Sequence, residues 1–177
     1  MIYESHYWKD PLLSSSKRLK KTRINNRNAE VTLARVEKQL FIGFYSIRKL
    51  LETFKISDNI KEIQLELTWH KNIKAVDYFN RHEVGELFDL STSNIESRNI
   101  EFICNQFIHS YVFLPLESTG GKLAGFYVSS DRSRQSKLYY VSLQQVTSIF
   151  NAVGSDYPTS SMIKRNTVSG QWEAVVV

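Results

Sequence analysis

The chain has few of the residues that cross-link or anchor a fold. Cys104 is the single cysteine among 177 residues, so no disulfide can form within the chain, and a reducing compartment is expected. The longest apolar-rich run is LFIGFYSI, which is far too short to cross a bilayer, and the first residues lack the apolar core of a signal peptide. We therefore expect a soluble, cytoplasmic protein.

Most recognised catalytic and metal-binding patterns are also absent. Gly120-Gly121 is typical of a turn and does not form a phosphate-binding loop at the start of a helix. There is no pair of cysteines and no His-x-x-x-His spacing, which argues against a zinc site. A Gly-x-Ser-x-Gly nucleophile turn is missing as well. The sequence predicts no metal site and no cofactor.

The positive charge is concentrated at the start of the chain. Residues 1–28 carry a net charge of +5, whereas residues 29–177 have 16 basic and 16 acidic side chains. The seven basic residues of this N-terminal segment are Lys9, Lys17, Arg18, Lys20, Lys21, Arg23 and Arg27. We interpret the segment as a basic connector preceding a single domain over 29–177. It is either a solvated leader or a surface that attracts phosphate groups or an acidic protein.

Hydrophobic spacing predicts a mainly helical domain. Apolar residues recur three and four apart over residues 29–55 and again over 142–153, which indicates two amphipathic helices. Strict alternation over residues 62–69 predicts a strand, and two β-rich runs flanking SDRSRQS predict a hairpin. The tip of this hairpin adds a second basic group, consisting of Arg132, Arg134 and Lys137.

Residues 95–116 are interpreted as a central helix that is apolar on almost every side. Such a helix must be covered on more than one face, and this predicts a homodimer through it. Asn105 and His109 lie four residues apart and therefore share one face. They are either a hydrogen-bonded pair that tethers the helix, a binding surface, or part of a catalytic site.

The stretch around Asn105, His109 and Tyr111 resembles the motif of the HEPN superfamily. That motif has an Arg, usually followed by a polar residue, four to six positions before a His, and often an aromatic residue two positions after it. The resemblance implies a helical bundle and a role in a bacterial toxin–antitoxin or phage-defence system. In active members, Arg and His from two protomers cleave RNA without a metal. Here Cys104 occupies the Arg position and supplies no cation for the charge that develops on phosphorus.

We therefore expect an α+β fold that is mainly helical, a HEPN-like helical bundle with two β-hairpin insertions. The expected function is a non-catalytic or weakly catalytic module that binds RNA or a protein. His109 and Asn105 are the candidate catalytic residues. The candidate nucleic-acid-binding residues are Lys17, Arg18, Lys20, Lys21, Arg23, Arg132, Arg134 and Lys137. One alternative is a metal-independent endoribonuclease using His109, and another is a structural partner-binding protein without a nucleic-acid role.

Overall fold

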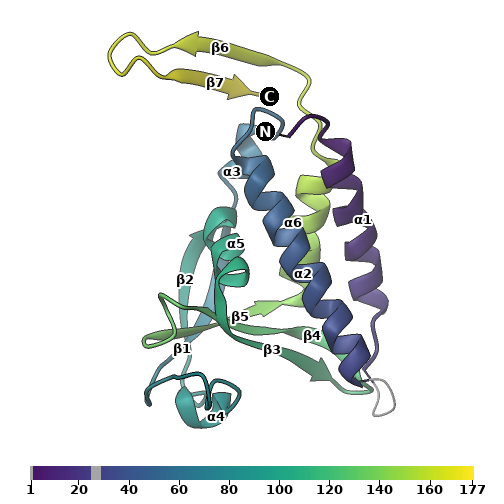
Figure 1. Ribbon diagram of the computed structural model, residues 1–177, viewed down its shortest axis with the longest axis vertical. Helices are drawn as coiled ribbons and strands as arrows, with labels where there is room; N and C mark the ends of the chain where they lie inside the picture. The colour runs from purple at the N-terminus through teal and green to yellow at the C-terminus, as the bar shows by residue number, and fades with distance from the viewer. Residues whose placement is uncertain (1, 25–28) are drawn as a thin grey trace.

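A five-stranded antiparallel sheet forms one layer of the computed structural model, which describes residues 2–24 and 29–177 (Figure 1). The order of its strands is β2-β1-β5-β4-β3. These strands are β1 (Gln64–Lys71), β2 (Asn94–Asn99), β3 (Ser110–Ser118), β4 (Lys122–Ser130) and β5 (Lys137–Ser142). A separate two-stranded hairpin follows at the C-terminal end, formed by β6 (Ser161–Arg165) and β7 (Trp172–Val176).

Three long helices run side by side next to the sheet, and a shorter helix lies between them and the strands (Figure 1). The long helices are α1 (His6–Lys21), α2 (Ala29–Leu51) and α6 (Leu143–Ser155), and the shorter one is α5 (Ile100–Ile108). Two single-turn helices complete the set, α3 (Asp58–Lys61) and α4 (Val84–Leu87). None of the described helices is long and apolar enough to cross a membrane.

Several of the predicted elements are confirmed. Helices α2 and α6 and the β4–β5 hairpin form where the spacing of apolar residues placed them, and β1 corresponds to the predicted alternating strand. Gly43 lets α2 approach α6 closely, because a Cβ atom there would lie 2.4 Å from the ring of Phe150. The amphipathic pattern was therefore sufficient to locate these elements.

The predicted mainly helical bundle is wrong. A five-stranded antiparallel sheet forms a full layer beside the helices, and only Ile100–Ile108 of the expected central helix is helical. The preceding Asn94–Asn99 and the following Ser110–Ser118 are strands. In β3, Phe113 packs into the main core while its neighbours Val112 and Leu114 pack into a second cluster on the other face. A strand buried on both faces has a continuous apolar sequence, which resembles that of a buried helix.

The N-terminal segment is not a connector, because residues 6–21 form a helix that packs on α6. Leu12 and Leu19 of α1 are fully buried and belong to the main hydrophobic core. Lys9 is also buried, and its ammonium group donates hydrogen bonds to the backbone carbonyls of Lys55 and Asp156. Arg27 lies outside the described residues. The positive charge of this segment is therefore attached to an ordered helix of the body.

Candidate nucleic-acid interface

A pocket of about 680 Å³ lies between the end of α5 and the tip of the β4–β5 hairpin. Its polar lining comes from β2, α5, the hairpin tip and β5, and includes Arg98, Asn105, His109, Arg132 and Lys137. The structure thus brings both candidate catalytic residues together with two of the candidate nucleic-acid-binding residues. We call this the hairpin pocket.

Helix α5 is positioned by caps at both ends. The Asn99 side chain accepts a hydrogen bond from the backbone N–H of Phe102 at 2.9 Å, which is a typical N-cap interaction. At the other end, the backbone of His109 accepts a hydrogen bond from the N–H of Asp131 at 3.0 Å. The end of the helix and the hairpin tip are therefore tied together by the backbone, which leaves the exposed His109 side chain directed to the pocket.

Gln106 holds the hairpin tip against α5 from a buried position. Its amide oxygen accepts hydrogen bonds from the backbone N–H of Ser130 at 2.9 Å and from the hydroxyl of Ser133 at 3.0 Å. The Ser133 hydroxyl also interacts with those of Ser129 and Ser130. This network fixes the chain on either side of Arg132, so the hairpin tip is a shaped part of the pocket.

Replacing Gln106 with leucine is expected to lower the free energy of unfolding by about 1–3 kcal/mol, because the N–H of Ser130 and the hydroxyl of Ser133 both lose the buried amide oxygen as an acceptor. Urea denaturation of the variant measures this loss. Gln144→Leu is the matched control, since Gln144 is exposed on α6, and its effect is expected to stay within about 0.5 kcal/mol. Equal stability of the two variants would show that the network does not hold the hairpin.

Glu96 connects three pocket side chains. Its carboxylate accepts hydrogen bonds from Arg98 Nε at 2.9 Å, from Lys137 Nζ at 2.5 Å and from the Tyr139 hydroxyl at 2.7 Å. Burial opposes ionisation of this carboxyl, but the three donors outweigh it and lower its pKa to about 2. Burial and the hydrogen bond to Glu96 raise the pKa of Tyr139, so this hydroxyl remains a donor.

Aromatic rings give the hairpin pocket an apolar wall. The Arg98 guanidinium lies 4.6 Å from the centre of the Phe102 ring, and Phe102 meets Tyr139 edge to face at 5.2 Å. Next to the pocket, Lys137 Nζ lies 4.1 Å from the ring of Trp69. Cations held beside aromatic faces are the combination with which proteins bind the phosphates and stacked bases of single-stranded nucleic acid.

The remaining candidate nucleic-acid-binding residues lie elsewhere. Arg134 lies outside the pocket lining, where its guanidinium covers the ring of Tyr111 at 3.8 Å and pairs with Asp131 at 3.3 Å. Four candidates, Lys17, Arg18, Lys20 and Lys21, are on α1, and Arg23 forms a backbone bridge to Lys122. Lys122 begins β4, whose nine residues span about 30 Å before the hairpin tip. The two basic groups are therefore separate surfaces.

In the expected continuous helix over residues 95–116, Arg98 would lie far from His109. In the structure, α5 begins only at Ile100 and Arg98 belongs to β2. The side chain folds over Phe102 and lines the same pocket as His109. Asn99 is the sequence signal that marks the start of α5 and so separates Arg98 from the helix, because it is a strong N-cap residue directly before an apolar run.

Cys104 does not replace the missing motif Arg, and neither does Arg48. Cys104 is fully buried in the core, and burial raises the pKa of its thiol well above the usual range. Arg48 pairs instead with Glu52 at 2.8 Å and with Glu101 at 3.0 Å. Arg98 and Arg132 are therefore the arginines that the structure places in the pocket with His109.

The apolar faces of α5 are covered within one chain. Ile100, Ile103 and Phe107 are fully buried, packed against α2 on one side and the sheet on the other. The reason for expecting a dimer through this helix is thereby removed, and a homodimer stays a prediction that light scattering can test.

The chain has no match among known protein families, curated proteins or solved structures. The HEPN resemblance therefore depends on the short motif alone. Within residues 2–24 and 29–177, no group of three or more His, Cys, Asp and Glu side chains is placed to hold a metal ion.

Proposed function

We propose that the protein is a non-catalytic module that binds single-stranded RNA in the hairpin pocket. The observation that carries this proposal is the convergence of Arg98, Arg132 and Lys137 with His109 in one pocket beside an aromatic wall. Arg132 is exposed and forms no ion pair within the described residues, so its guanidinium is available to a phosphate. Arg98 is bound to Glu96 through Nε, which leaves its other N–H groups as donors.

Substituting both hairpin cations, in the variant Arg132→Gln/Lys137→Gln, is expected to weaken RNA binding at least tenfold. If each side chain contacts one phosphate, the slope of log K against log salt falls by about 1.4 for a single strand. Fluorescence anisotropy with a labelled single-stranded RNA of about ten nucleotides measures both quantities.

The matched control for this experiment is Lys164→Gln/Arg165→Gln on the exposed strand β6, which removes the same charges far from the hairpin pocket. It should bind RNA within about twofold of the natural protein, since long-range charge effects are screened at physiological salt. Equal losses in the two double variants would mean that only net charge matters, and the pocket would not be the binding site. Deleting residues 1–28 is not a suitable test, because this removes helix α1, which packs on α6 and contributes Leu12 and Leu19 to the core.

A metal-independent endoribonuclease is a second candidate, supported by the presence of Arg98 and His109 in one pocket. An arginine could stabilise charge on phosphorus while an imidazole transfers a proton. The pocket lining holds a single imidazole, whereas general acid–base cleavage needs a second proton-transfer group. Asp131 is the carboxylate in this lining, and it is bound to Arg134. We therefore favour binding over cleavage.

The variant His109→Ala separates the two candidates. Its free energy of unfolding should change by no more than about 0.5 kcal/mol, because the side chain is exposed and its ring has no hydrogen-bond partner within the described residues. We expect the natural protein to leave RNA intact and the variant to bind it severalfold more weakly. Products ending in a cyclic phosphate that disappear in the variant would establish the endoribonuclease instead.

A further inference from the structure

Two exposed aromatic rings lie on the segment that precedes α4. Tyr78 is 64% exposed and Phe79 is 84% exposed, and the two rings are nearly perpendicular, with their centres 5.6 Å apart. Rings of this size are usually buried, so two neighbouring rings in solvent indicate a binding surface. The segment lies beside the tip of the β4–β5 hairpin and therefore close to the hairpin pocket (Figure 1).

Hydrogen bonds fix the turn that carries these rings. The Asp77 carboxylate accepts from the backbone N–H of Phe79 at 2.8 Å and of Asn80 at 3.1 Å, and the Asn80 side chain accepts from the N–H of Asp77 at 2.8 Å. From the hairpin tip, Gln135 accepts from the N–H of Val76 at 3.0 Å and donates to its carbonyl at 2.7 Å. A turn that is already ordered loses little conformational entropy when its side chains bind a ligand.

Two guanidinium groups lie on the aromatic rings of this region. Arg81 lies 4.6 Å from the centre of the Tyr78 ring and 5.7 Å from that of Tyr111, and Arg134 lies 3.8 Å from that of Tyr111. Arg81 is exposed and forms no ion pair within the described residues. A guanidinium on a ring keeps N–H groups at its edge for a phosphate. We call Tyr78, Phe79, Arg81, Tyr111 and Arg134 the stacking surface.

The stacking surface is continuous with the hairpin pocket. Asp131 lines the pocket and pairs with Arg134 at 3.3 Å, and Arg134 covers the ring of Tyr111. Tyr111 follows His109 by two residues, where β3 leaves the end of α5. A ligand that is longer than the pocket therefore meets alternating cations and rings as it passes the hairpin tip.

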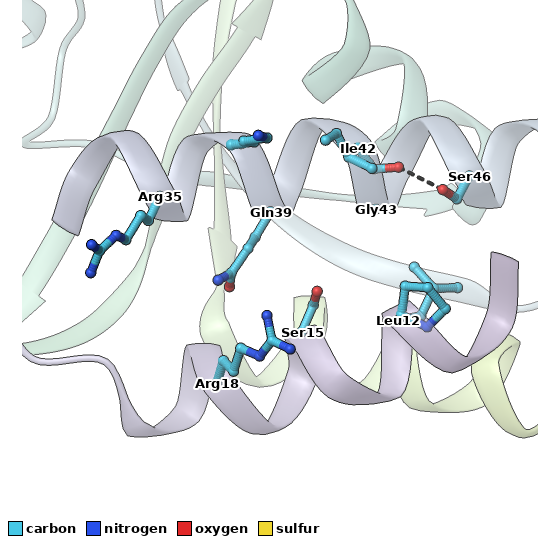
Figure 2. Close-up of a pocket in the computed structure, with 10 residues that line it drawn as sticks. Leu12, Ser15, Arg18, Arg35, Gln39, Ile42, Gly43 and Ser46 are labelled. Carbon is cyan, nitrogen blue, oxygen red and sulfur yellow. Dashed lines mark hydrogen bonds between the residues drawn. The ribbon is translucent and has the colours of Figure 1, made fainter. Parts of the chain in front are cut away.

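The pocket between α1 and α2 lacks this combination. Its volume is about 270 Å³, and its lining includes Arg18, Arg35 and Lys38. Figure 2 shows Arg35 directed away from Arg18, and none of the residues that line the pocket is aromatic. These cations attract anions without offering a base a flat face, so they do not form a comparable surface for a nucleic-acid strand.

We propose that a single-stranded RNA bound in the hairpin pocket continues across the stacking surface. Phe79 and Tyr78 each stack on one base, and Arg81 contacts the phosphate between these bases. Because the two rings are nearly perpendicular, the two bases are separated from one another, which an unpaired strand permits and a duplex does not. This inference rests on the RNA binding proposed for the hairpin pocket, and it extends that site to a longer strand.

Fluorescence anisotropy on the full chain, with labelled oligouridine of four and of ten nucleotides, tests the proposal. Tyr78→Ala/Phe79→Ala should weaken binding of the ten-nucleotide RNA at least tenfold, because two bases lose their stacking partners, and should leave the four-nucleotide RNA within twofold. The slope of log K against log salt should not change in this variant, since no charge is removed. Arg81→Gln should reduce that slope by about 0.7 for the ten-nucleotide RNA.

The matched control is Tyr3→Ala/Tyr7→Ala, which removes two exposed rings near the N-terminus, at the other end of the molecule from α4 (Figure 1). Both RNA lengths should bind this control within twofold of the natural protein. Phe79→Leu separates stacking from apolar contact, because leucine keeps an apolar side chain and has no flat face. It should weaken the ten-nucleotide RNA at least fivefold. Circular dichroism on every variant verifies folding.

The inference is overturned if Tyr78→Ala/Phe79→Ala binds the ten-nucleotide RNA as the natural protein does while Arg132→Gln/Lys137→Gln weakens it, because the RNA then occupies the hairpin pocket alone. Equal weakening of both lengths by Tyr78→Ala/Phe79→Ala would overturn it too, since the rings would then act by supporting the hairpin. Full affinity in Phe79→Leu would exclude stacking. If the natural protein binds neither RNA, the proposed function of the hairpin pocket fails, and this inference fails with it.

Discussion

Replacing Phe107 with alanine is expected to lower the free energy of unfolding by about 3–5 kcal/mol. Phe107 is fully buried on α5 and lies where that helix meets both α2 and the sheet. Its ring stacks on Phe44 of α2, with the centroids 4.2 Å apart, and meets Phe126 of β4 edge to face at 6.0 Å. Truncation removes these contacts and leaves a cavity that the two rigid layers cannot close.

Urea denaturation followed by fluorescence measures this effect. Phe79→Ala is the matched control, because this ring is 84% exposed and its loss should change the free energy of unfolding by no more than about 0.5 kcal/mol. A loss below about 1.5 kcal/mol for Phe107→Ala would mean that α5 is not held by this aromatic cluster. The hairpin pocket would then lack its main support, since Asn105 and His109 depend on the position of α5.

The sequence was sufficient to predict the elements that have one solvent-exposed face and one buried face. Helix α2 and strand β1 both have this character, so their periods of 3.6 and 2 were visible. Strand β3 has no solvent-exposed face over most of its length. Its period of two residues was therefore not visible in the sequence. Pro115 within it is tolerated because β3 is the last strand of the sheet and has a free edge.

Helix α1 was missed for a different reason. Its buried positions are Lys9, Leu12, Ser16 and Leu19, spaced three and four apart along one face. Two of these four residues are polar, so the apolar stripe is incomplete in the sequence. Only the tertiary structure supplies their partners: Lys9 reaches the carbonyls of Lys55 and Asp156, and the Ser16 hydroxyl donates to the carbonyl of Thr147.

The candidate site was found in part. Asn105 and His109 were selected by their helical spacing, and both line the hairpin pocket. The spacing could not predict that β2 and β5 bring Arg98 and Lys137 to the same place. Both strands pair with β1, and these pairings join residues up to about seventy positions apart in the sequence. Glu96, which connects them, falls within the expected helix over residues 95–116 and is not among the candidate site residues.

Replacing Glu96 with glutamine is expected to have two opposite effects. The free energy of unfolding should fall by about 2–3 kcal/mol at neutral pH, because a carboxylate with a pKa of about 2 loses its charge-assisted hydrogen bonds with Arg98, Lys137 and Tyr139. RNA affinity should rise severalfold, since the same carboxylate partly neutralises the two cations of the pocket. Glu62→Gln, at an exposed position before β1, is the charge-matched control for both measurements.

The pH dependence identifies the carboxylate as the cause. The pKa of Glu96 is lower in the folded protein than the ordinary 4.5, so its contribution is complete above about pH 5 and is lost as the pH falls toward 2. The natural protein and Glu96→Gln should therefore differ most at pH 7, differ by clearly less at pH 3, and converge only as the pH approaches 2. Asp89, whose pKa is lowered to about 2 by hydrogen bonds from Ser91 and Thr92, titrates in both proteins and cancels in the comparison. If the difference in stability stayed constant from pH 7 to pH 3, the loss would be due to packing and not to the charge of Glu96. If RNA affinity fell in Glu96→Gln, the main role of Glu96 would be to position the binding cations, and its neutralisation of their charge would be secondary.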